Sequence, residues 1–319
     1  MSDSTNTLPK VSVVMPCYNS LKYLRLAIDS VLGQDYPNIE LIVVDDGSTD
    51  GSIAELESYG DKIVLFKQKN KGPAAARNLG LLHATGQYIA FNDSDDLWLP
   101  GKLTKQVSFL EEHLEFIACF TKWGVWDGTS QPSYQPVQPE VKTSFENDKT
   151  GWLYLKLLKE SIIHTISILI RSDVVKKVGL FNESYKVGED HDYWIRLSRM
   201  GQIAHLNEVC ALYRDNLEST TKKLHEKNYS AIILQSSFEN FGLSMPNGVT
   251  LPYSTYLDYL ALRNFNYGYR RFWAGNRSEA KKSFYTCLKL KRLLVKSFIY
   301  IVICHIPSLY RVLVNTRNS

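Results

Sequence analysis

Strand-like and helix-like segments alternate through about the first hundred residues of this 319-residue chain. Four short runs rich in β-branched and apolar residues predict strands, and the segments between them show helical spacing or are rich in alanine and leucine. The predicted strands are 11–15, 39–44, 62–66 and 88–91, and the predicted helices are 21–32, 52–59 and 73–85. This order predicts an α/β fold, with a parallel sheet and helices on both of its faces.

Acidic side chains follow two of these predicted strands. Residues 45–46 read DD, and residues 93–96 read DSDD. In parallel sheets the ligand crevice lies at the carboxyl ends of the strands, so the two clusters are predicted to meet at one edge. Like charges so close together repel, and burial strengthens the repulsion. The clusters therefore predict a positive partner that the surrounding sequence does not supply.

Asp93 and Asp95 form a DxD pattern. In an extended chain their carboxylates share one face, roughly 6.5–7 Å apart, and they offer hard oxygen ligands to Mg²⁺ or Mn²⁺. Such an ion keeps several waters and takes further ligands from substrate phosphates, so the missing partner is predicted to be a metal that carries a diphosphate. The alternative is an acidic loop that caps the next helix, with Asp96 as its N-cap.

The stretch 43–52, VVDDGSTDGS, also fits the start of an EF-hand calcium loop, with Glu57 at the twelfth position. A β-branched strand precedes it instead of a helix, and no second copy exists, which argues against an EF-hand. The alternative is a strand-end turn in which Asp46 accepts a hydrogen bond from a ligand and Gly47 permits a tight backbone path. A turn that caps the helix beginning at Ser52 is compatible with both.

Two further stretches place charged groups near predicted helix starts. Residues 70–80 read NKGPAAARNLG, and Gly72 frees the backbone at a helix N-terminus, which favours anions. Arg77 either faces the acidic crevice, where it holds a carboxylate or phosphate, or is a surface arginine. Residues 188–194 read GEDHDYW before a predicted helix, 192–200. Capping explains one or two of these charges, and the cluster suggests a general base at the rim of a site.

With these stretches, in this order, the chain resembles the family 2 nucleotide-sugar glycosyltransferases of the GT-A fold. The matching text is VSVVMPCYNS at 11–20, VVDDGSTDGS at 43–52, NKGPAAARNLGL at 70–81, YIAFNDSDDLWLPGKL at 88–103, LIRSDVVKKVGLFNE at 169–183 and GEDHDYWIRL at 188–197. The resemblance covers residues 10 to about 215. It implies a GT-A type, Rossmann-like, mostly parallel sheet and an inverting reaction.

The expected domain organisation follows from this resemblance. Residues 1–9 are expected to be disordered and residues 10–220 to form the catalytic domain. Within it, 10–100 would bind the nucleotide sugar, and 101–220 would supply the acceptor side and the catalytic base. Residues 221–319 are predicted to form a C-terminal helical region.

The resemblance also implies which residues bind the donor. Pro16, Tyr18 and Asp46 are expected to contact the nucleoside, usually uridine. Asp93 and Asp95 are expected to hold Mn²⁺ or Mg²⁺ on the diphosphate.

Further residues are implied at the reacting centre. Asp190 is expected to be the catalytic base, and Arg77 is expected to lie near the nucleotide. Ser94 and Glu189 are assigned to substrate binding. Trp98 is a candidate for shaping the acceptor site, together with the proline-containing stretch 127–149, which is predicted to be a long surface loop.

The predicted activity is transfer of one sugar from a nucleotide-sugar donor, expected to be a UDP-sugar, to the hydroxyl of a glycan or lipid-linked acceptor. By resemblance it serves cell-surface polysaccharide or lipopolysaccharide assembly. A nucleotidyltransferase would carry a glycine-rich, basic loop after the first strand, where this chain reads PCYNS at 16–20. A non-catalytic calcium or carbohydrate-binding module is a second alternative. A dehydrogenase is unsupported, since no GxGxxG follows that strand.

Charge and cysteine content indicate which partners and which cellular compartment to expect. A net charge of +4 does not argue for a nucleic-acid partner. The five cysteines are scattered without a CxxC pair, which fits a reducing cytoplasm better than a zinc site or a disulfide framework. The polar N-terminus lacks the apolar stretch of a signal peptide.

The C-terminal region is predicted to be helical. Residues 261–290 resemble one helical hairpin of the tetratricopeptide kind, with its turn at Gly275-Asn276. Residues 293–306 read LLVKSFIYIVICHI, short of the ~20 residues needed to span a bilayer as a helix. Because 281–296 holds six basic residues and no acid, the region 281–314 is predicted either to lie in the interface of an anionic membrane at its inner face or to pack on protein.

Overall fold

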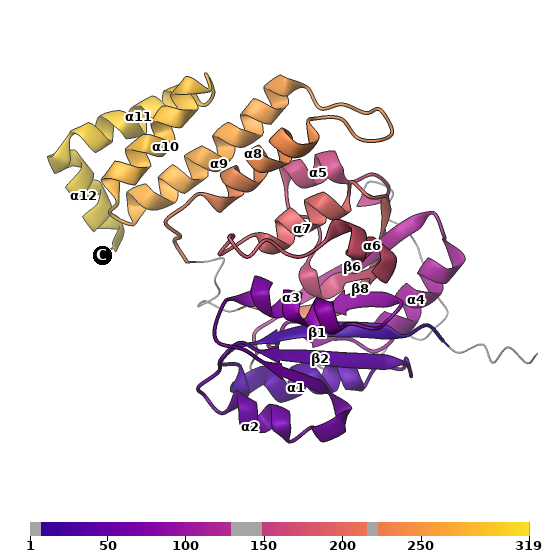
Figure 1. The fold of residues 1–319 in the computed structure, drawn as a ribbon. Coiled ribbons are helices and arrows are strands. Elements are labelled where there is room, and N and C mark those ends of the chain that lie inside the picture. The colour runs from indigo at the N-terminus through magenta and orange to yellow at the C-terminus, as the bar shows by residue number, and fades with distance from the viewer. Residues whose placement is uncertain (1–7, 129–148, 216–222, 319) are drawn as a thin grey trace, which may run out of the picture. The chain divides into compact units, whose positions relative to one another are not determined.

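The structure, a computed structural model, describes residues 8–128, 149–215 and 223–318 of the chain. The backbone divides into two compact units, Met1–Leu217 and Glu218–Ser319, which Figure 1 colours in chain order. The predicted boundary near residue 220 falls outside the described residues, as do most of the predicted N-terminal tail and of the predicted loop 127–149.

The first unit contains eight strands and seven α-helices among its described residues. The strands are β1 (Val11–Cys17), β2 (Ile39–Asp45), β3 (Val64–Lys67), β4 (Tyr88–Phe91), β5 (Leu97–Trp98), β6 (Phe116–Trp126), β7 (Ile168–Arg171) and β8 (Gln202–Arg214). The helices are α1 (Leu21–Leu32), α2 (Ser52–Glu57), α3 (Pro73–His83), α4 (Lys102–Glu112), α5 (Tyr154–Lys159), α6 (Ser172–Val178) and α7 (Glu189–Leu197). A short 3-10 turn, η3 (Thr165–Ser167), precedes β7.

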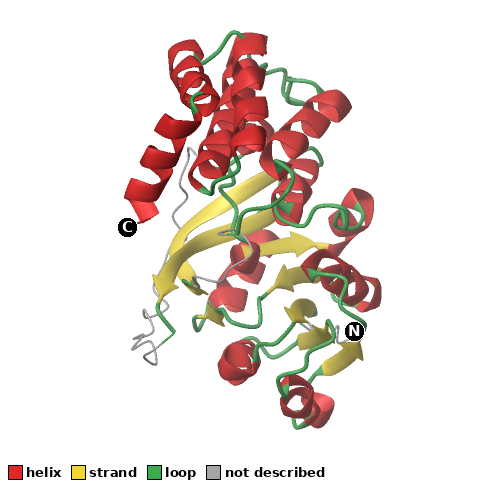
Figure 2. Cartoon of the chain, turned by 90° about the vertical axis from the view of Figure 1, so that its left-hand side faces the viewer, coloured by secondary structure: helices red, strands yellow, loops and turns green. Residues whose placement is uncertain are grey.

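All eight strands belong to one sheet with the order β3-β2-β1-β4-β7-β6-β8-β5. β1, β2, β3 and β4 pair in parallel, as do β6 and β8. β7 is antiparallel to both of its neighbours, and β5 is antiparallel to β8. The two longest strands, β6 and β8, lie side by side in Figure 2. The predicted α/β fold is confirmed, and β6 and β8 complete it without having been predicted.

Helices cover both faces of the parallel strands, with α3 on one face and α1 and α2 on the other (Figure 1). Val13 and Met15 of β1 pack into the core formed with α1, whereas Ile42 of β2 packs with α3. α3 approaches β1 closely, because a Cβ at Gly80 would lie only 2.4 Å from Val14 Cγ1. Burial on both faces explains why these strands read as continuous apolar runs.

β1 continues through Pro16 to Cys17, although the sequence predicts that it ends at the proline. The carbonyl of Val14 accepts a hydrogen bond from Asn92 N, just past the end of β4. The backbone of Pro16, two residues further along, is directed toward the same neighbouring strand as that of Val14, namely β4. At the position of Pro16, β4 has already ended. The missing N–H of Pro16 therefore removes no bond of the sheet.

Asp50 caps both helices that begin beside the crevice. Its Oδ2 accepts from Leu21 N at the start of α1 (3.0 Å), and its Oδ1 accepts from Ser52 N at the start of α2 (3.0 Å). Ser20 precedes α1, but its hydroxyl lies 2.7 Å from the hydroxyl of Ser94 and does not cap the helix. The cap of α1 thus comes from a loop about thirty residues away in sequence.

Trp98 lies in the core of the first unit and does not line a surface, which corrects its predicted role at the acceptor site. Only 3% of it is exposed, and its Nε1 donates to the carbonyl of Ile166 at 2.9 Å. The Nζ atom of the fully buried Lys102 lies 4.0 Å from the centre of its ring and donates to Gln106 Oε1 at 2.6 Å. Burial lowers the pKa of Lys102 to about 8. The apolar and cation–π contacts of the indole leave it no face for a substrate.

The second unit is helical where the structure describes it. Its helices are α8 (Tyr229–Phe241), α9 (Tyr253–Trp273), α10 (Arg277–Lys289), α11 (Leu294–His305) and α12 (Pro307–Asn318). The predicted hairpin is confirmed by α9 and α10, whose turn holds Gly275 at φ +83° and Asn276, which accepts from Glu279 N at 3.1 Å. In the described part of the chain, no single helix is both long and apolar enough to cross a bilayer. Taken together, α11 and residues 307–313 are long and apolar enough, but they meet at a bend of 107°.

Candidate active site at the carboxyl edge of the sheet

Arg77 of α3 joins two acidic segments that lie nearly a hundred residues apart in sequence. Its Nη2 lies 2.7 Å from Asp93 Oδ1, in the loop after β4, and its Nη1 lies 2.9 Å from Glu189 Oε1, at the start of α7. The charge of Asp190 also acts on this guanidinium. The acids that follow β4 and those that begin α7 therefore converge on a single side chain.

The environment of Arg77 decides between its two predicted roles. Only 5% of the residue is exposed, so the surface alternative is wrong. Burial alone would lower its pKa, but Asp93 and Glu189 together raise the pKa above the ordinary value for arginine. Both ends of the guanidinium hold protein carboxylates, which makes Arg77 the group that positions Asp93 and Glu189.

Arg214, at the end of β8, is a second positive partner that sequence reasoning missed. Its guanidinium forms an ion pair with Asp95, and its backbone N donates to Asp96 Oδ1 at 2.8 Å. The ring of Tyr23 lies 4.0 Å from the centre of the guanidinium. The chain therefore supplies part of the positive charge that the acidic cluster was predicted to take from a metal alone. No local signal marks Arg214, because its partner Asp95 is 119 residues away.

Asp96 is a buried structural group and not the N-cap of the following helix. Helix α4 begins only at Lys102, after Gly101. Burial, followed by the charges of Asp95 and Asp93, raises the pKa of Asp96 well above its usual value. Because it accepts from Arg214 N, the carboxyl group of Asp96 ties the loop after β4 to the end of β8.

The remaining charges fit a divalent cation. In the described part of this cluster, the acids Asp93, Asp95, Glu189 and Asp190 outnumber the two arginines, Arg77 and Arg214. Burial and the charge of Asp93 raise the pKa of Asp95 even beside Arg214. Burial and the charge of Asp190 likewise raise the pKa of Glu189 even beside Arg77. In both cases the neighbouring arginine does not offset the combined effect of burial and the second carboxylate.

Asp93 and Asp95 have the oxygen chemistry that Mg²⁺ or Mn²⁺ prefers. Each arginine engages one oxygen of its aspartate, and both aspartate side chains remain partly accessible. Within the described ranges, no three or more His, Cys, Asp or Glu side chains are grouped to hold a metal by themselves. A site built here would need further oxygen ligands from a phosphate-bearing substrate, as is usual for Mg²⁺.

Asp46 is buried, and its carboxylate accepts hydrogen bonds from groups of the protein itself. Its Oδ1 accepts from Gln68 Nε2 at 2.7 Å and from Lys71 N at 2.8 Å, and its Oδ2 accepts from Gly72 N at 2.8 Å. These bonds hold the segment that leads into α3. The predicted contact of Asp46 with the nucleoside stays a prediction.

The neighbouring Asp45 rules out the EF-hand interpretation. Its carboxylate accepts hydrogen bonds from Gly47 N at 3.1 Å and from Ser48 N at 3.2 Å. The segment follows strand β2 and is closed by its own backbone. It is a strand-end turn, the alternative reading of this stretch.

Three other predicted donor residues lie at the same strand ends. Tyr18 follows β1 and is half exposed, with its side chain accessible to a ligand. Pro16, the preceding strand residue, is partly buried. Ser94 is nearly buried and meets Ser20 through its hydroxyl. Their contacts with a nucleotide sugar stay predictions.

Asp190 lies in the first turn of α7, which begins at Glu189, three residues before the predicted start. Gly188 precedes it with φ +81°, a left-handed conformation that favours glycine. Thr165 Oγ1 donates to Asp190 Oδ2 at 3.2 Å, and His191 N donates to Asp190 Oδ1 at 2.7 Å. The carboxylate is thereby oriented from two sides. Thr165 lies in η3, 25 residues before Asp190, and no local signal in the sequence marks this contact.

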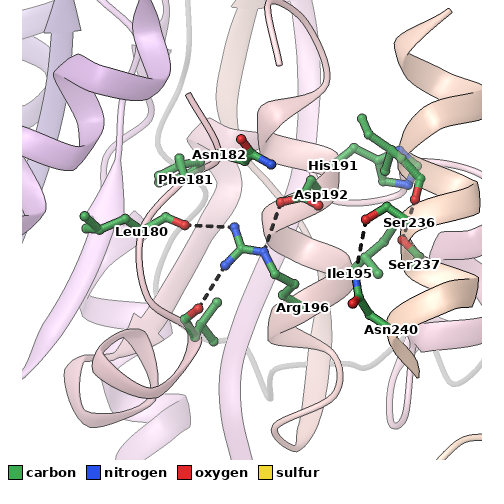
Figure 3. A network of polar contacts seen from close by, with 12 residues as sticks. Leu180, Phe181, Asn182, His191, Asp192, Ile195, Arg196, Ser236, Ser237 and Asn240 are labelled. Carbon is green, nitrogen blue, oxygen red and sulfur yellow. Dashed lines mark hydrogen bonds and ion pairs between the residues drawn. The ribbon is translucent and has the colours of Figure 1, made fainter. Parts of the chain in front are cut away.

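Arg196 anchors α7 to the segment that follows α6 (Figure 3). Its Nε donates to Asp192 Oδ2, and its two terminal nitrogens donate to the carbonyls of Val178 and Leu180, each at 2.9 Å. The ring of Phe181 stacks on that of Tyr193 at 4.2 Å between centres. The helix that carries Asp190 is thus fixed by polar and aromatic contacts, which keep the carboxylate in place.

Comparison with known proteins connects this geometry to a family. Residues 12–179 match the model of Glycosyl transferase family 2. The chain belongs to this family. Over 214 residues the family 2 glycosyltransferase is 36% identical to an uncharacterised glycosyltransferase of Rickettsia typhi, a match that covers 67% of this chain and 66% of that protein. Over 218 residues it is 35% identical to TuaG of Bacillus subtilis, whose name assigns it to teichuronic acid biosynthesis, covering 66% of this chain and 81% of TuaG.

Solved structures show the same fold. TarS 1–349 of S. aureus, solved with UDP-GlcNAc, superposes with a TM-score of 0.64 at 20% identity, covering 97% of this chain and 91% of that one. The family resemblance and the GT-A type fold expected from the sequence are both confirmed. The match to the Rickettsia typhi relative spans about two thirds of that protein's length, 66%.

Proposed function

We propose that this family 2 glycosyltransferase transfers one sugar, with inversion, from a UDP-sugar to an acceptor hydroxyl. The observation that carries the proposal is the convergence of Asp93 and Glu189 on Arg77, beside Asp190. A pair of metal-binding carboxylates and a separate, oriented carboxylate are the two elements that such a transfer requires.

Asp190 acts as the general base in this proposal. Its carboxylate, oriented by Thr165 and His191 N, takes the proton from the acceptor hydroxyl. The acceptor oxygen then attacks the anomeric carbon on the face opposite the leaving group, which inverts the configuration. Asp93 and Asp95 would hold the divalent cation, and Arg77 and Arg214 keep these two carboxylates in place. When bound, the cation neutralises charge that develops on the departing diphosphate.

Two comparisons support the choice of donor and pathway. A protein of the same fold was solved with UDP-GlcNAc, which supports a uridine nucleotide. TuaG, named for teichuronic acid biosynthesis, supports a role in assembling a cell-surface polysaccharide. The acceptor would then be a glycan or a lipid-linked glycan.

A donor screen tests the metal and the nucleotide together. UDP-sugars with Mn²⁺ are expected to raise the melting temperature by several degrees, since a ligand that binds only the folded state stabilises it. GDP- and dTDP-sugars are expected to have little effect, and EDTA is expected to abolish both the shift and the release of UDP. The measurements are thermal melts and a UDP-release assay.

Other outcomes of the screen point elsewhere. Undiminished turnover in EDTA would remove the cation from the mechanism. Stabilisation without any cleavage of the donor would favour the non-catalytic binding module. Release of pyrophosphate from a nucleoside triphosphate and a sugar phosphate would favour a nucleotidyltransferase.

We also propose that α11 and α12 contact a membrane surface. One side of α11 packs in the core of the second unit through Ile301 and Cys304. The side formed by Val295, Phe298 and Ile299 is exposed, by 74%, 60% and 50% respectively. A helix that is apolar on its outer side as well as its inner side has an unpartnered surface, which a lipid interface can cover.

The charge of the same region favours anionic lipid. Glu279 is the last acidic residue of the chain, and the forty residues after it contain eight basic residues. Such a balance suits the cytoplasmic leaflet, whose anionic lipids attract basic segments. The inner face of the cell membrane is therefore the proposed location, where a lipid-linked acceptor would be within reach.

A vesicle experiment tests the membrane contact. The double substitution Phe298→Ser, Ile299→Ser is expected to weaken sedimentation with phosphatidylglycerol-containing vesicles by about tenfold or more, because two apolar side chains no longer enter the interface. Leu262→Ser, which changes an exposed apolar residue of α9, is the matched control and should bind as the unmodified protein does. If the unmodified protein ignores vesicles and forms a dimer through this face, the alternative of packing on protein is correct.

A further inference from the structure

Trp123 of β6, Tyr213 of β8 and His164, which precedes η3, bring their rings together in one cluster. The ring centre of Trp123 lies 4.8 Å from that of His164 and 6.0 Å from that of Tyr213, and His164 lies 4.9 Å from Tyr213. These three residues are called the aromatic wall. Trp123 is 40% exposed, a large apolar surface for a tryptophan whose position is fixed by two neighbouring rings.

The aromatic wall adjoins the candidate base. His164 directly precedes Thr165, whose hydroxyl donates to Asp190 at 3.2 Å. Burial lowers the pKa of His164, while the charges of Asp93 and Asp190 act in the opposite direction, so both carboxylates lie within electrostatic reach of the ring. The wall therefore borders the space that an acceptor must enter to present a hydroxyl to Asp190.

The polar atoms of this cluster also point to a ligand site. His164 Nδ1 is buried and has no hydrogen-bond partner among the described residues. Buried polar atoms are usually satisfied, so an unpaired one beside a site calls for an explanation. A half-exposed indole next to an unsatisfied ring nitrogen, on the segment that also holds Asp190, offers an apolar face with polar groups near it, the combination that small polar ligands use for orientation.

We propose that the aromatic wall binds a sugar ring of the acceptor, so that the attacking hydroxyl belongs to a pyranoside. The C–H face of a pyranose is apolar and slightly positive, and it packs on the electron-rich face of an indole. Its hydroxyl groups then point to the rim, where Asp190 lies. An acyclic polyol phosphate or a lipid phosphate has no flat face to place on Trp123.

The proposal deepens the proposed function and rests on it. The exposed face of the wall is small, a single indole extended along β6 by Val125, two residues further on and on the same face of the strand. A surface of this size, next to the segment whose Thr165 holds Asp190, suits one polar ring and not an acyl chain.

The experiment compares acceptors and variants in a UDP-release assay. The acceptors are a panel of p-nitrophenyl pyranosides, with glycerol phosphate, ribitol phosphate and polyprenyl phosphate as non-pyranoside acceptors. Trp123→Ala is expected to raise the KM for the pyranoside roughly tenfold or more, and Trp123→Phe to raise it less, since stacking area is lost in proportion. The slow hydrolysis of the UDP-sugar in the absence of acceptor is measured for each variant, so that an effect on cleavage of the donor is separated from an effect on the acceptor KM.

Leu114→Ala is the matched control. Leu114 precedes the opposite end of β6 and is more exposed than Trp123, so its loss should leave the acceptor KM as it is. Thermal melts of all three variants check that the fold is retained, and Trp123→Phe keeps the test valid if the alanine variant unfolds.

The outcomes separate this inference from the proposed function. The proposal that the aromatic wall binds a sugar ring is contradicted if the acceptor KM is unchanged in Trp123→Ala, or if the unmodified protein transfers only to the non-pyranoside acceptors. Either result remains compatible with the glycosyltransferase reaction. If the unmodified protein cleaves no nucleotide sugar, with or without any acceptor, the proposed function itself has failed.

Discussion

The substitution Asp190→Asn is expected to lower kcat by about 10²–10⁴-fold, the usual contribution of a general base. The asparagine amide has nearly the same shape and can still accept a bond from Thr165 or from His191 N, but it cannot take a proton from the acceptor. Donor binding should persist, because Asp93 and Asp95 are unchanged. The measurements are the rate of UDP release with acceptor and the thermal shift produced by UDP-sugar with Mn²⁺.

Asp192→Asn is the matched control for this prediction. Asp192 lies two residues further along α7 and pairs with Arg196, which faces the segment after α6 (Figure 3). Its substitution removes a neighbouring carboxylate of the same motif without touching the oriented group, so kcat should remain close to that of the unmodified protein. Transfer by Asp190→Asn at a near-normal rate would show that the base has been assigned to the wrong residue.

The substitution Arg77→Met is expected to lower the free energy of unfolding by about 3–5 kcal/mol, the range seen when one partner of a buried ion pair is removed. Only 5% of Arg77 is exposed and Glu189 is also buried, so solvent screens little of the charge that Glu189 is left with, although it screens the partly accessible Asp93 more. Activity should fall with stability, since Asp93 is no longer held in the loop after β4. Urea unfolding of the full chain measures the loss.

Two further variants make the result specific. Arg25→Met removes an arginine that is largely exposed and pairs with Glu55, so the expected loss is at most about 1 kcal/mol. Combining Arg77→Met with Glu189→Gln removes one unpaired charge and should recover part of the stability without recovering activity. A loss for Arg77→Met no larger than that for Arg25→Met would contradict the buried network.

Local sequence accounts well for the parallel part of the sheet formed by β1 to β4. Helix α1 and strand β4 occupy the predicted residues 21–32 and 88–91. In these segments the spacing of the apolar residues, the residues that end the element and the faces that become buried all favour the helix or strand that is observed. The positions of the acidic stretches after β2 and β4 follow directly from that alternation.

The features that the sequence did not predict depend on contacts between segments that are distant in the chain. β6 and β8 pair with each other over sequence separations of more than eighty residues, with shifts in register, and no turn between them marks the pairing. Arg214 reaches Asp95 only because β8 ends beside the loop after β4. The burial of Trp98 also depends on elements distant in sequence, such as the carbonyl of Ile166 that its indole nitrogen meets.

The chain's own sequence determined the α/β alternation, the acidic motifs and the family, because strand and helix periods and short motifs are written within a few residues. Only the tertiary structure decided which charges neutralise which. Coulomb energy depends on distance through the folded molecule and on burial, and neither is encoded in the spacing along the chain. That is why Arg77 and Arg214 emerged as the partners of Asp93 and Asp95 only once the strands had been placed side by side.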